Sequence, residues 1–377
     1  MKILIVTQGY YPGQKYGGPP VSIKNFCDLM VQSIEVFIIT LNHDLGDSQV
    51  YQSIAQGWNI LGNCSVMYLQ DKCFNRNTFE REICMLKPDV IYLQSLFQQC
   101  VLPVTMIAKK MNLKLLLAPR GELCSGAMKK KYKKLPYIFL LRMLGLTRKI
   151  AFQSTSPEET NDIVKYFGVQ SNVYYLENIP SKPRTEYNQR FKESGVARII
   201  FISRIVEKKN LLYALICLQS VTEGDVVFDV FGSIEDEGYW EKCLKASDKL
   251  SPNIKFTYRG ELAHDDVQNV MSNYDVFILP TYSENYGHVI AEALSVSVPV
   301  IISNTTPWNC VNEERAGWAI PLDNRNGFVD AINNIISMNN SQYVILSRNA
   351  KTLFENSSRY EKLKEKYLFA LKQIVKN

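Results

Sequence analysis

The chain has 377 residues, of which 46% are hydrophobic and 21% charged, with a formal net charge of +6. This length favours two domains, and the composition is ordinary for a globular protein with a full core. No apolar run reaches the length of a membrane-spanning helix, and residues 3–6 are too short for a signal-peptide core. The nine cysteines show no C-x-x-C spacing. They are expected to be reduced, which favours a cytoplasmic protein.

Short apolar runs alternate with helix-like segments along the first half of the chain. This alternation predicts a parallel, doubly wound (Rossmann-like) α/β domain over residues 1–180. A stretch around residues 177–189 holds two prolines and no periodicity, so we place the interdomain linker at residues 181–195. The strands predicted in this half are residues 3–7, 35–40, 65–69, 89–93, 113–118, 150–153 and 173–176.

A second alternation of the same kind follows the linker and predicts a second doubly wound domain over residues 196–358. The last segment, residues 359–377, is a Lys/Glu-rich helix whose candidate packing partner is the first domain. Two such domains imply a cleft between them. The strands predicted in this half are residues 197–203, 226–231, 254–258, 276–279, 298–302 and 317–320.

Two glutamates follow the strand at residues 276–279. Glu284 falls in the turn at the carboxyl end of this strand, where parallel sheets bind their ligands. If a helix begins near Asn285, Glu292 projects from its second turn on a nearby face. Carboxylates accept hydrogen bonds, so the pair suits a ligand with many hydroxyl groups. The alternative is a solvated helix face, but Glu292 lies in an apolar run, and a buried carboxylate needs a partner.

Cations follow the first strand of the second domain. Arg204 ends this strand and Lys209 precedes the next helix, a position that suits an anionic diphosphate. Basic residues on the surface of a βα loop are the alternative. In the first domain, Gly17 and Gly18 lie in a loop where backbone N–H groups can approach a phosphate closely. This loop has neither the dinucleotide nor the P-loop pattern.

One basic and one aromatic residue each allow more than one role. Arg120 ends a strand of the first domain and could bind a phosphate or acidic sugar of the acceptor, or pair with Glu122 or another carboxylate. Trp308 could stack on a sugar or anchor its loop by packing.

A basic cluster precedes the apolar run at residues 135–141. It could contact an anionic membrane surface, or it could be the solvated end of an ordinary core helix. Nucleic acid is disfavoured because no aromatic-interleaved basic strand accompanies the cluster. Its members are Lys129, Lys130, Lys131, Lys133 and Lys134.

The block from Glu284 to Glu292, between a strand ending in Leu-Pro and a Pro-Val-Ile strand, resembles the retaining nucleotide-sugar glycosyltransferases of family 4. The resemblance implies the GT-B fold, with two Rossmann-like domains facing across a cleft. It implies a hexosyltransferase whose catalytic residues are Glu284, Arg204 and Lys209, the two cations replacing a metal. It implies no other cofactor. The donor residues carried over are Gly17, Gly18, Arg204, Lys209, Glu284, Asn285, Tyr286, Gly287, His288 and Glu292.

The block at residues 118–123 resembles a subset of these enzymes that assemble surface polysaccharides. Where many members have a histidine, this chain has Gln94 and Ser95, and with Arg120 these are the candidate acceptor residues. The implied acceptor is a glycan, free or linked to undecaprenyl lipid, as in lipopolysaccharide, O-antigen or capsule assembly. The implied location is the cytoplasm, peripheral on the inner face of the membrane.

Two other functions remain open. A sugar-nucleotide epimerase or hydrolase of the same fold would share the donor site but use no acceptor. A non-catalytic partner subunit would keep a degenerate cleft. A nicotinamide oxidoreductase is disfavoured because the glycine fingerprint is missing.

Overall fold

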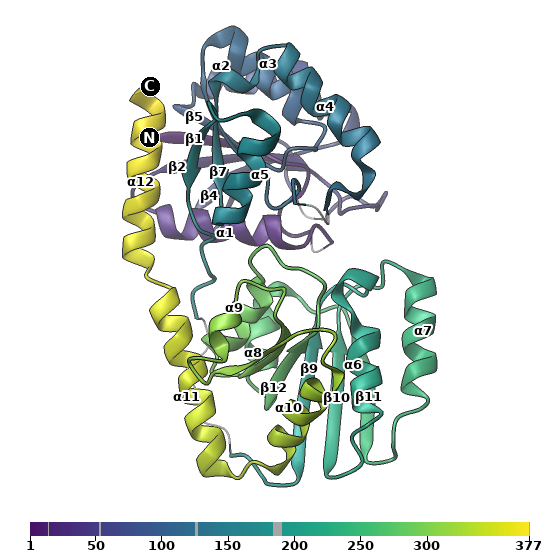
Figure 1. Cartoon of the computed structure of the whole chain (residues 1–377). Helices are drawn as coiled ribbons and strands as arrows, with labels where there is room; N and C mark the ends of the chain where they lie inside the picture. Colours follow the sequence, from purple (N-terminus) through teal and green to yellow (C-terminus); the bar gives the residue numbers. More distant parts are fainter. Residues whose placement is uncertain (14, 53, 125–126, 184–190, 377) are drawn as a thin grey trace. The chain divides into compact units, whose positions relative to one another are not determined.

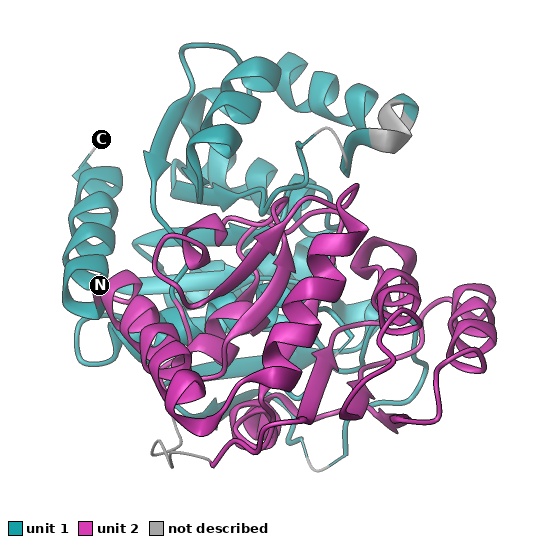
Figure 2. Cartoon of the chain, turned by 60° about the horizontal axis from the view of Figure 1, so that its bottom comes forward, with its two compact units in different colours: residues 1–179, 360–377 teal, residues 180–359 magenta. Residues whose placement is uncertain are grey.

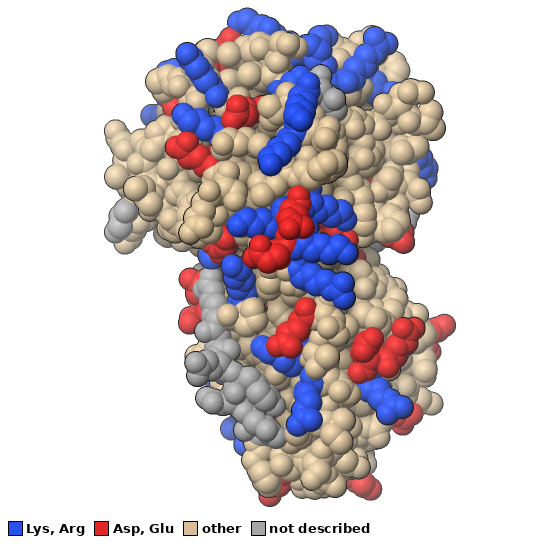
Figure 3. All heavy atoms as spheres, turned by 90° about the vertical axis from the view of Figure 1, so that its left-hand side faces the viewer, with Lys and Arg blue, Asp and Glu red and all other residues tan. Residues whose placement is uncertain are grey.

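The computed structural model describes all residues except 14, 53, 125–126, 184–190 and 377. The chain divides into two compact units (Figure 2). Unit 1 comprises residues 1–179 with 360–377, and unit 2 comprises residues 180–359. On the face that carries the C-terminal helix, basic and acidic side chains are intermixed (Figure 3).

Unit 1 is built on an eight-stranded sheet in the order β3-β4-β2-β1-β5-β6-β7-β8. All neighbouring strands are parallel except β3 and β4. The strands are β1 (Lys2–Val6), β2 (Glu35–Leu41), β3 (Trp58–Leu61), β4 (Cys64–Leu69), β5 (Val90–Gln94), β6 (Lys114–Ala118), β7 (Ile150–Ser154) and β8 (Asn172–Tyr175).

Helices cover both faces of this sheet (Figure 1), which is why its central strands are mostly apolar. Along β1, Leu4 and Val6 enter one core, whereas Ile3 and Ile5 enter the core on the other face. The helices are α1 (Gly18–Met30), α2 (Arg76–Leu86), α3 (Val101–Met111), α4 (Lys131–Met143), α5 (Pro157–Phe167) and the C-terminal α12 (Tyr360–Lys376); the 3-10 turns are η1 (Asp71–Cys73), η2 (Ala127–Lys130) and η3 (Thr147–Lys149).

The C-terminal helix α12 packs on unit 1, although it follows unit 2 in the sequence. Its apolar face joins the same core as that of α1, with Tyr367 1% and Leu371 0% exposed. The Tyr367 hydroxyl donates to the Glu177 carbonyl at 2.8 Å and accepts from Gln153 Nε2 at 2.9 Å. A buried hydroxyl needs such partners, so these bonds hold α12 against β7 and against the segment that follows β8.

Unit 2 has a fully parallel six-stranded sheet in the order β11-β10-β9-β12-β13-β14. The order reverses at β9, between β10 and β12, and such a switch point is where open α/β sheets bind ligands. Its elements are β9 (Val196–Ile202), η4 (Glu207–Lys209), α6 (Leu211–Leu218), β10 (Asp225–Phe231), α7 (Glu237–Ser247), β11 (Ile254–Gly260), η5 (His264–Asp266), α8 (Val267–Met271), β12 (Val276–Leu279), α9 (His288–Ser295), β13 (Val300–Ser303), η6 (Asn309–Val311), β14 (Gly317–Ile320), α10 (Arg325–Ser337) and α11 (Asn340–Ser357).

The predicted fold class, two parallel-sheet α/β domains, is confirmed by these two sheets. The edge strand β3 was not predicted. It pairs antiparallel with β4 and leaves Ile60 87% exposed, so it carries little of the apolar signal of a core strand.

Candidate active site

The loops that follow β9 and β12 are joined at the switch point of unit 2. The backbone N–H of Tyr282 donates to the Lys208 carbonyl at 2.9 Å, and the Thr281 hydroxyl donates to the same oxygen at 3.0 Å. Ser303 and Thr305, at the end of β13, donate to the Thr281 carbonyl in turn. The segments that follow three neighbouring strands, β9, β12 and β13, are therefore joined by hydrogen bonds into one rigid polar edge.

This edge brings Lys209 and Glu284 together. The Lys209 ammonium forms an ion pair with Glu284 Oε1. The two side chains are 14% and 12% exposed, so the pair is largely withdrawn from solvent but keeps an opening to it. Its desolvation makes each charge dependent on the other, because a lone charge in such a place is costly.

Arg204 lies in the same βα loop but has a different partner. Its Nη1 contacts both carboxylate oxygens of Glu235, at 3.3 and 3.0 Å. Glu235 follows β10, and this loop is tied to the Arg204 loop because Ile205 N–H donates to the Ser233 carbonyl at 2.8 Å. Glu235 was missed by the sequence reasoning, although its place just after a strand that ends in glycine is a detectable signal.

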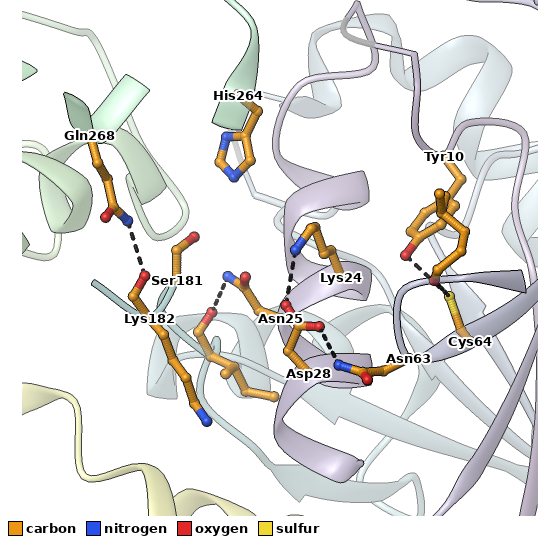
Figure 4. Close-up of polar contacts among 12 residues, drawn as sticks. Tyr10, Lys24, Asn25, Asp28, Asn63, Cys64, Ser181, Lys182, His264 and Gln268 are labelled. Atoms are coloured by element: carbon orange, nitrogen blue, oxygen red, sulfur yellow. Dashed lines mark hydrogen bonds and ion pairs between the residues drawn. The ribbon is translucent and has the colours of Figure 1, made fainter. Parts of the chain in front are cut away.

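Glu292 is 4% exposed and lies on α9. Its Oε1 is 3.5 Å from His264 Nε2 and accepts a hydrogen bond from the Ser181 hydroxyl at 3.4 Å. Figure 4 shows His264 and Ser181 with the neighbouring bond from Gln268 Nε2 to the Lys182 carbonyl, 3.2 Å long. His264, which starts the η5 turn, is a second site neighbour that the sequence did not indicate.

The helix predicted to begin near Asn285 begins at His288 instead. Gly287 is its N-cap, in a left-handed conformation with φ of 78°. An added Cβ at Gly287 would come within 2.9 Å of Ile290 Cδ1. The helix starts three residues later than predicted because residues 284–287 are not helical, while Glu284 lies before the helix as predicted.

Aromatic packing orders this segment. The rings of Tyr286 and Trp308 are 5.6 Å apart, and Trp308 Nε1 donates to the Tyr286 carbonyl at 2.6 Å. The ring of His288 lies 4.8 Å from that of Tyr286. Trp308 is only 5% exposed, which decides between its two predicted roles in favour of a packing anchor.

Five of the predicted site residues belong to unit 1. Gly17 is the N-cap of α1 with φ of 73°, and Gly18 is the first residue of that helix. Arg120 donates from Nε to Gln94 Oε1 at 2.8 Å. Ser95 instead donates to Glu122 Oε1 at 2.7 Å. The alternative in which Arg120 pairs with Glu122 is therefore wrong.

The lysine cluster is described only in part. The side chains of Lys129, Lys130, Lys131 and Lys133 lie outside the described residues. Lys134 Nζ donates to the Ala127 carbonyl at 2.9 Å and lies 4.4 Å from the centre of the Phe97 ring. This lysine therefore contacts its own unit.

Two further properties concern the described part of the chain. It holds no group of three or more His, Cys, Asp or Glu side chains arranged to bind a metal ion. None of its helices combines the length and hydropathy needed to cross a bilayer.

The architecture is that of the GT-B glycosyltransferases. Sucrose-phosphate synthase from Thermosynechococcus elongatus superimposes with a TM-score of 0.72 at 12% identity, over 99% of this chain and 98% of that one. Residues 184–353 match the family described as glycosyl transferases group 1. The matched segment contains Arg204, Lys209, Glu284 and Glu292.

Two curated relatives that the chain matches are glycosyltransferases by name. The chain is 27% identical over 172 residues to UDP-Gal:alpha-D-GlcNAc-diphosphoundecaprenol alpha-1,3-galactosyltransferase of Escherichia coli, over 44% of each chain. It is 30% identical over 146 residues to capsular polysaccharide biosynthesis glycosyltransferase CapM of Staphylococcus aureus, over 37% of this chain and 35% of that one. The matches thus span less than half the length of these relatives.

Proposed function

We propose that the protein transfers a sugar from a nucleotide-sugar donor to a lipid-linked glycan, with retention at the anomeric carbon, in bacterial surface-polysaccharide assembly. The match of residues 184–353 to the glycosyl transferases group 1 family supports glycosyl transfer. The names of the E. coli and S. aureus relatives support the acceptor class and the process. Retention and membership of family 4 rest on the resemblance of the Glu284–Glu292 block.

The observation that carries the proposal is the Lys209–Glu284 pair at the switch point of unit 2. When the sugar leaves the diphosphate, negative charge grows on the departing phosphate oxygens. Lys209 and Arg204 stabilise this charge as fixed cations. Glu284 accepts hydrogen bonds from hydroxyls of the donor sugar and Glu292 from the ribose, while residues 285–288 line the sugar. The proposal assigns no catalytic metal, and it keeps Gly17 and Gly18 as donor-loop residues.

A panel of nucleotides tests the donor site. Full-length protein is heated with UDP, GDP, ADP or one of their sugars, and its melting temperature is recorded. A ligand that binds only the folded state raises this temperature. We expect one base to give a clear rise. No rise with any of them would contradict the proposal, whereas complete turnover of the donor without acceptor would favour the epimerase or hydrolase.

Arg204 and Glu235 should act on nucleotide binding with opposite signs. Arg204 is already in contact with Glu235, at 3.0 Å, so a bound diphosphate must displace Glu235 to reach Arg204. Both side chains are partly exposed to solvent, which allows this exchange. Glu235→Gln removes the competing charge, so we expect tighter binding of the nucleoside diphosphate by about threefold to tenfold. Arg204→Gln should weaken it by about tenfold or more. Isothermal titration calorimetry measures both, and weaker binding by the Glu235 variant would count against this arrangement.

The proposal includes peripheral contact with an anionic membrane through α4. This helix exposes a stripe of apolar side chains at a spacing of three or four residues, on one helical face. Exposed apolar surface next to basic residues is typical of a helix that lies in a membrane interface. The exposed fractions are Tyr132 71%, Leu135 43%, Phe139 62%, Leu140 40% and Met143 70%. The adjoining sequence carries the lysine cluster of residues 129–134.

Vesicle binding tests this contact. We expect full-length protein to cosediment with phosphatidylglycerol vesicles, more weakly at high salt, and not with phosphatidylcholine vesicles. Replacing both Phe139 and Met143 by Ser should weaken binding by at least about tenfold, because exposed apolar area leaves the interface. Phe369→Ser is the matched control, since Phe369 is 65% exposed on α12. Equal loss in the control, or binding to both lipids alike, would refute the assignment to α4.

A further inference from the structure

Arg120 is a half-buried cation at the carboxyl end of β6, held by neutral oxygen atoms. Its Nε donates to Gln94 Oε1 at 2.8 Å, its Nη2 to the Tyr92 hydroxyl at 3.2 Å, and its Nη1 to Asn178 Oδ1. A guanidinium has five N–H donors. Three are used here, and the remaining two have no acceptor among the described residues.

The nearest carboxylates in the sequence are engaged elsewhere. Glu122 accepts from the Ser95 hydroxyl at 2.7 Å and from Leu96 N–H at 2.6 Å. Glu159 accepts from Gly121 N–H at 2.6 Å and from Thr155 N–H at 2.7 Å. Within the described ranges, no carboxylate oxygen lies within 4.0 Å of the Arg120 guanidinium. Its charge therefore has no partner in the described protein.

Tyr92 does not supply that partner. Burial raises the pKa of Tyr92, although the charge of Arg120 opposes this effect. The hydroxyl is therefore neutral at physiological pH. It accepts from Arg120 and donates its own proton to Gln153 Oε1. Its role is to fix the position of the guanidinium rather than to neutralise it.

Backbone strain marks the same place. Arg120 has φ of 54° and Ser95 has φ of 124°, and both follow neighbouring parallel strands. Left-handed conformations cost about 1 to 3 kcal/mol for residues other than glycine, and they gather at functional sites. Ligands of open α/β sheets bind at the carboxyl ends of the strands, which is where both residues lie.

We propose that Arg120 is the binding site for an anionic group, a phosphate or a carboxylate, on the acceptor substrate. The proposal rests on the transferase function above, because it names the chemistry of the acceptor. A guanidinium suits both groups, since its planar N–H donors match two oxygens of one anion. Its three neutral partners hold it in place without neutralising it, so the anion meets a pre-oriented cation.

Anion titrations test the site without knowledge of the acceptor. The full-length R204Q/K209M protein lacks the donor-site cations, and it is titrated with inorganic pyrophosphate or with glucuronate by calorimetry. We expect one of these probes to bind, and the one that binds distinguishes a phosphate from a carboxylate. Adding R120Q should weaken that binding by about tenfold or more. The matched control is R148Q, because Arg148 is an exposed arginine of unit 1.

A second variant keeps Arg120 in place. Q94E puts a carboxylate of the same shape against Nε, so it supplies the missing counter-charge internally and should weaken anion binding as R120Q does. Nucleoside diphosphate binding by the otherwise wild-type protein should change less than about twofold with either variant. Unchanged anion binding in R120Q and Q94E, or no binding of either probe at millimolar concentration, would overturn the site. If the wild-type protein bound no nucleoside diphosphate, the transferase proposal itself would instead be contradicted.

Discussion

Lys209→Met should lower the turnover number of glycosyl transfer by about 100-fold to 1,000-fold, the usual cost of removing one fixed donor from a developing charge. The Lys209 ammonium, at the end of the η4 turn, is held by Glu284, and the Lys209 side chain is only 14% exposed. A cation in such a position is pre-oriented and weakly screened, so its loss acts on the transition state more than on the bound donor. The measurement is initial velocity against donor concentration, with the nucleotide sugar selected by the panel.

Lys208→Met is the matched control. Lys208 is the preceding residue and is exposed, and its backbone carbonyl, which the substitution keeps, is what joins the two loops. We expect the Lys208 variant to keep its turnover within about twofold, as most surface changes do. A Lys209 variant with wild-type turnover, or equal losses in both variants, would show that Lys209 does not act on the leaving group.

Combining Lys209→Met with Glu284→Gln separates catalysis from stability. Each single change leaves a poorly solvated charge of the other sign, and this should lower the melting temperature. The double change removes both charges, so we expect it to recover much of the melting temperature while activity stays lost. Such non-additive behaviour is expected for residues in direct contact.

The sequence could predict the fold because both sheets depend on apolar runs that are buried on two faces. Residues 3–6, for example, are 0% exposed, and such strands have a clear pattern. The start of α9 could not be placed by periodicity, because it is set by a single residue. Gly287, just before the helix, has a left-handed conformation with φ of 78°. An added Cβ at Gly287 would meet Ile290 and Trp308, and the place of Trp308 depends on the tertiary fold.

The candidate site could likewise be predicted only in part. Strand-end positions alone place Arg204, Lys209 and Glu284 at one edge of unit 2, and the structure pairs Lys209 with Glu284 there. The pairing of Arg204 with Glu235 could not be deduced, since Glu235 follows another strand, and its place after that strand does not say which cation it meets. Likewise, the contact of Glu292 with His264 depends on how α9 packs on α8. The roles of these residues in donor binding stay predictions.

Gly232→Ala should destabilise the protein by roughly 3 kcal/mol or more, through strain and overlap together. Gly232 follows β10 with φ of 140°, and an added Cβ would lie 1.8 Å from the Ser203 carbonyl oxygen. This oxygen belongs to backbone, which cannot rotate away as a side chain would. Because Ser203 precedes Arg204, the loop must shift at the site itself, so nucleotide binding should weaken as well.

Gly260→Ala is the control that isolates the overlap from the strain. Gly260 ends the neighbouring strand β11 with φ of 81°, and an added Cβ would meet no atom within 4 Å. Only the cost of a left-handed alanine remains there, about 1 kcal/mol. The midpoint of urea unfolding, followed by circular dichroism, compares the two variants. Similar midpoints would mean that the backbone of β10 and the Arg204 loop can separate freely, and the rigid edge that positions the cations would then lose its physical basis.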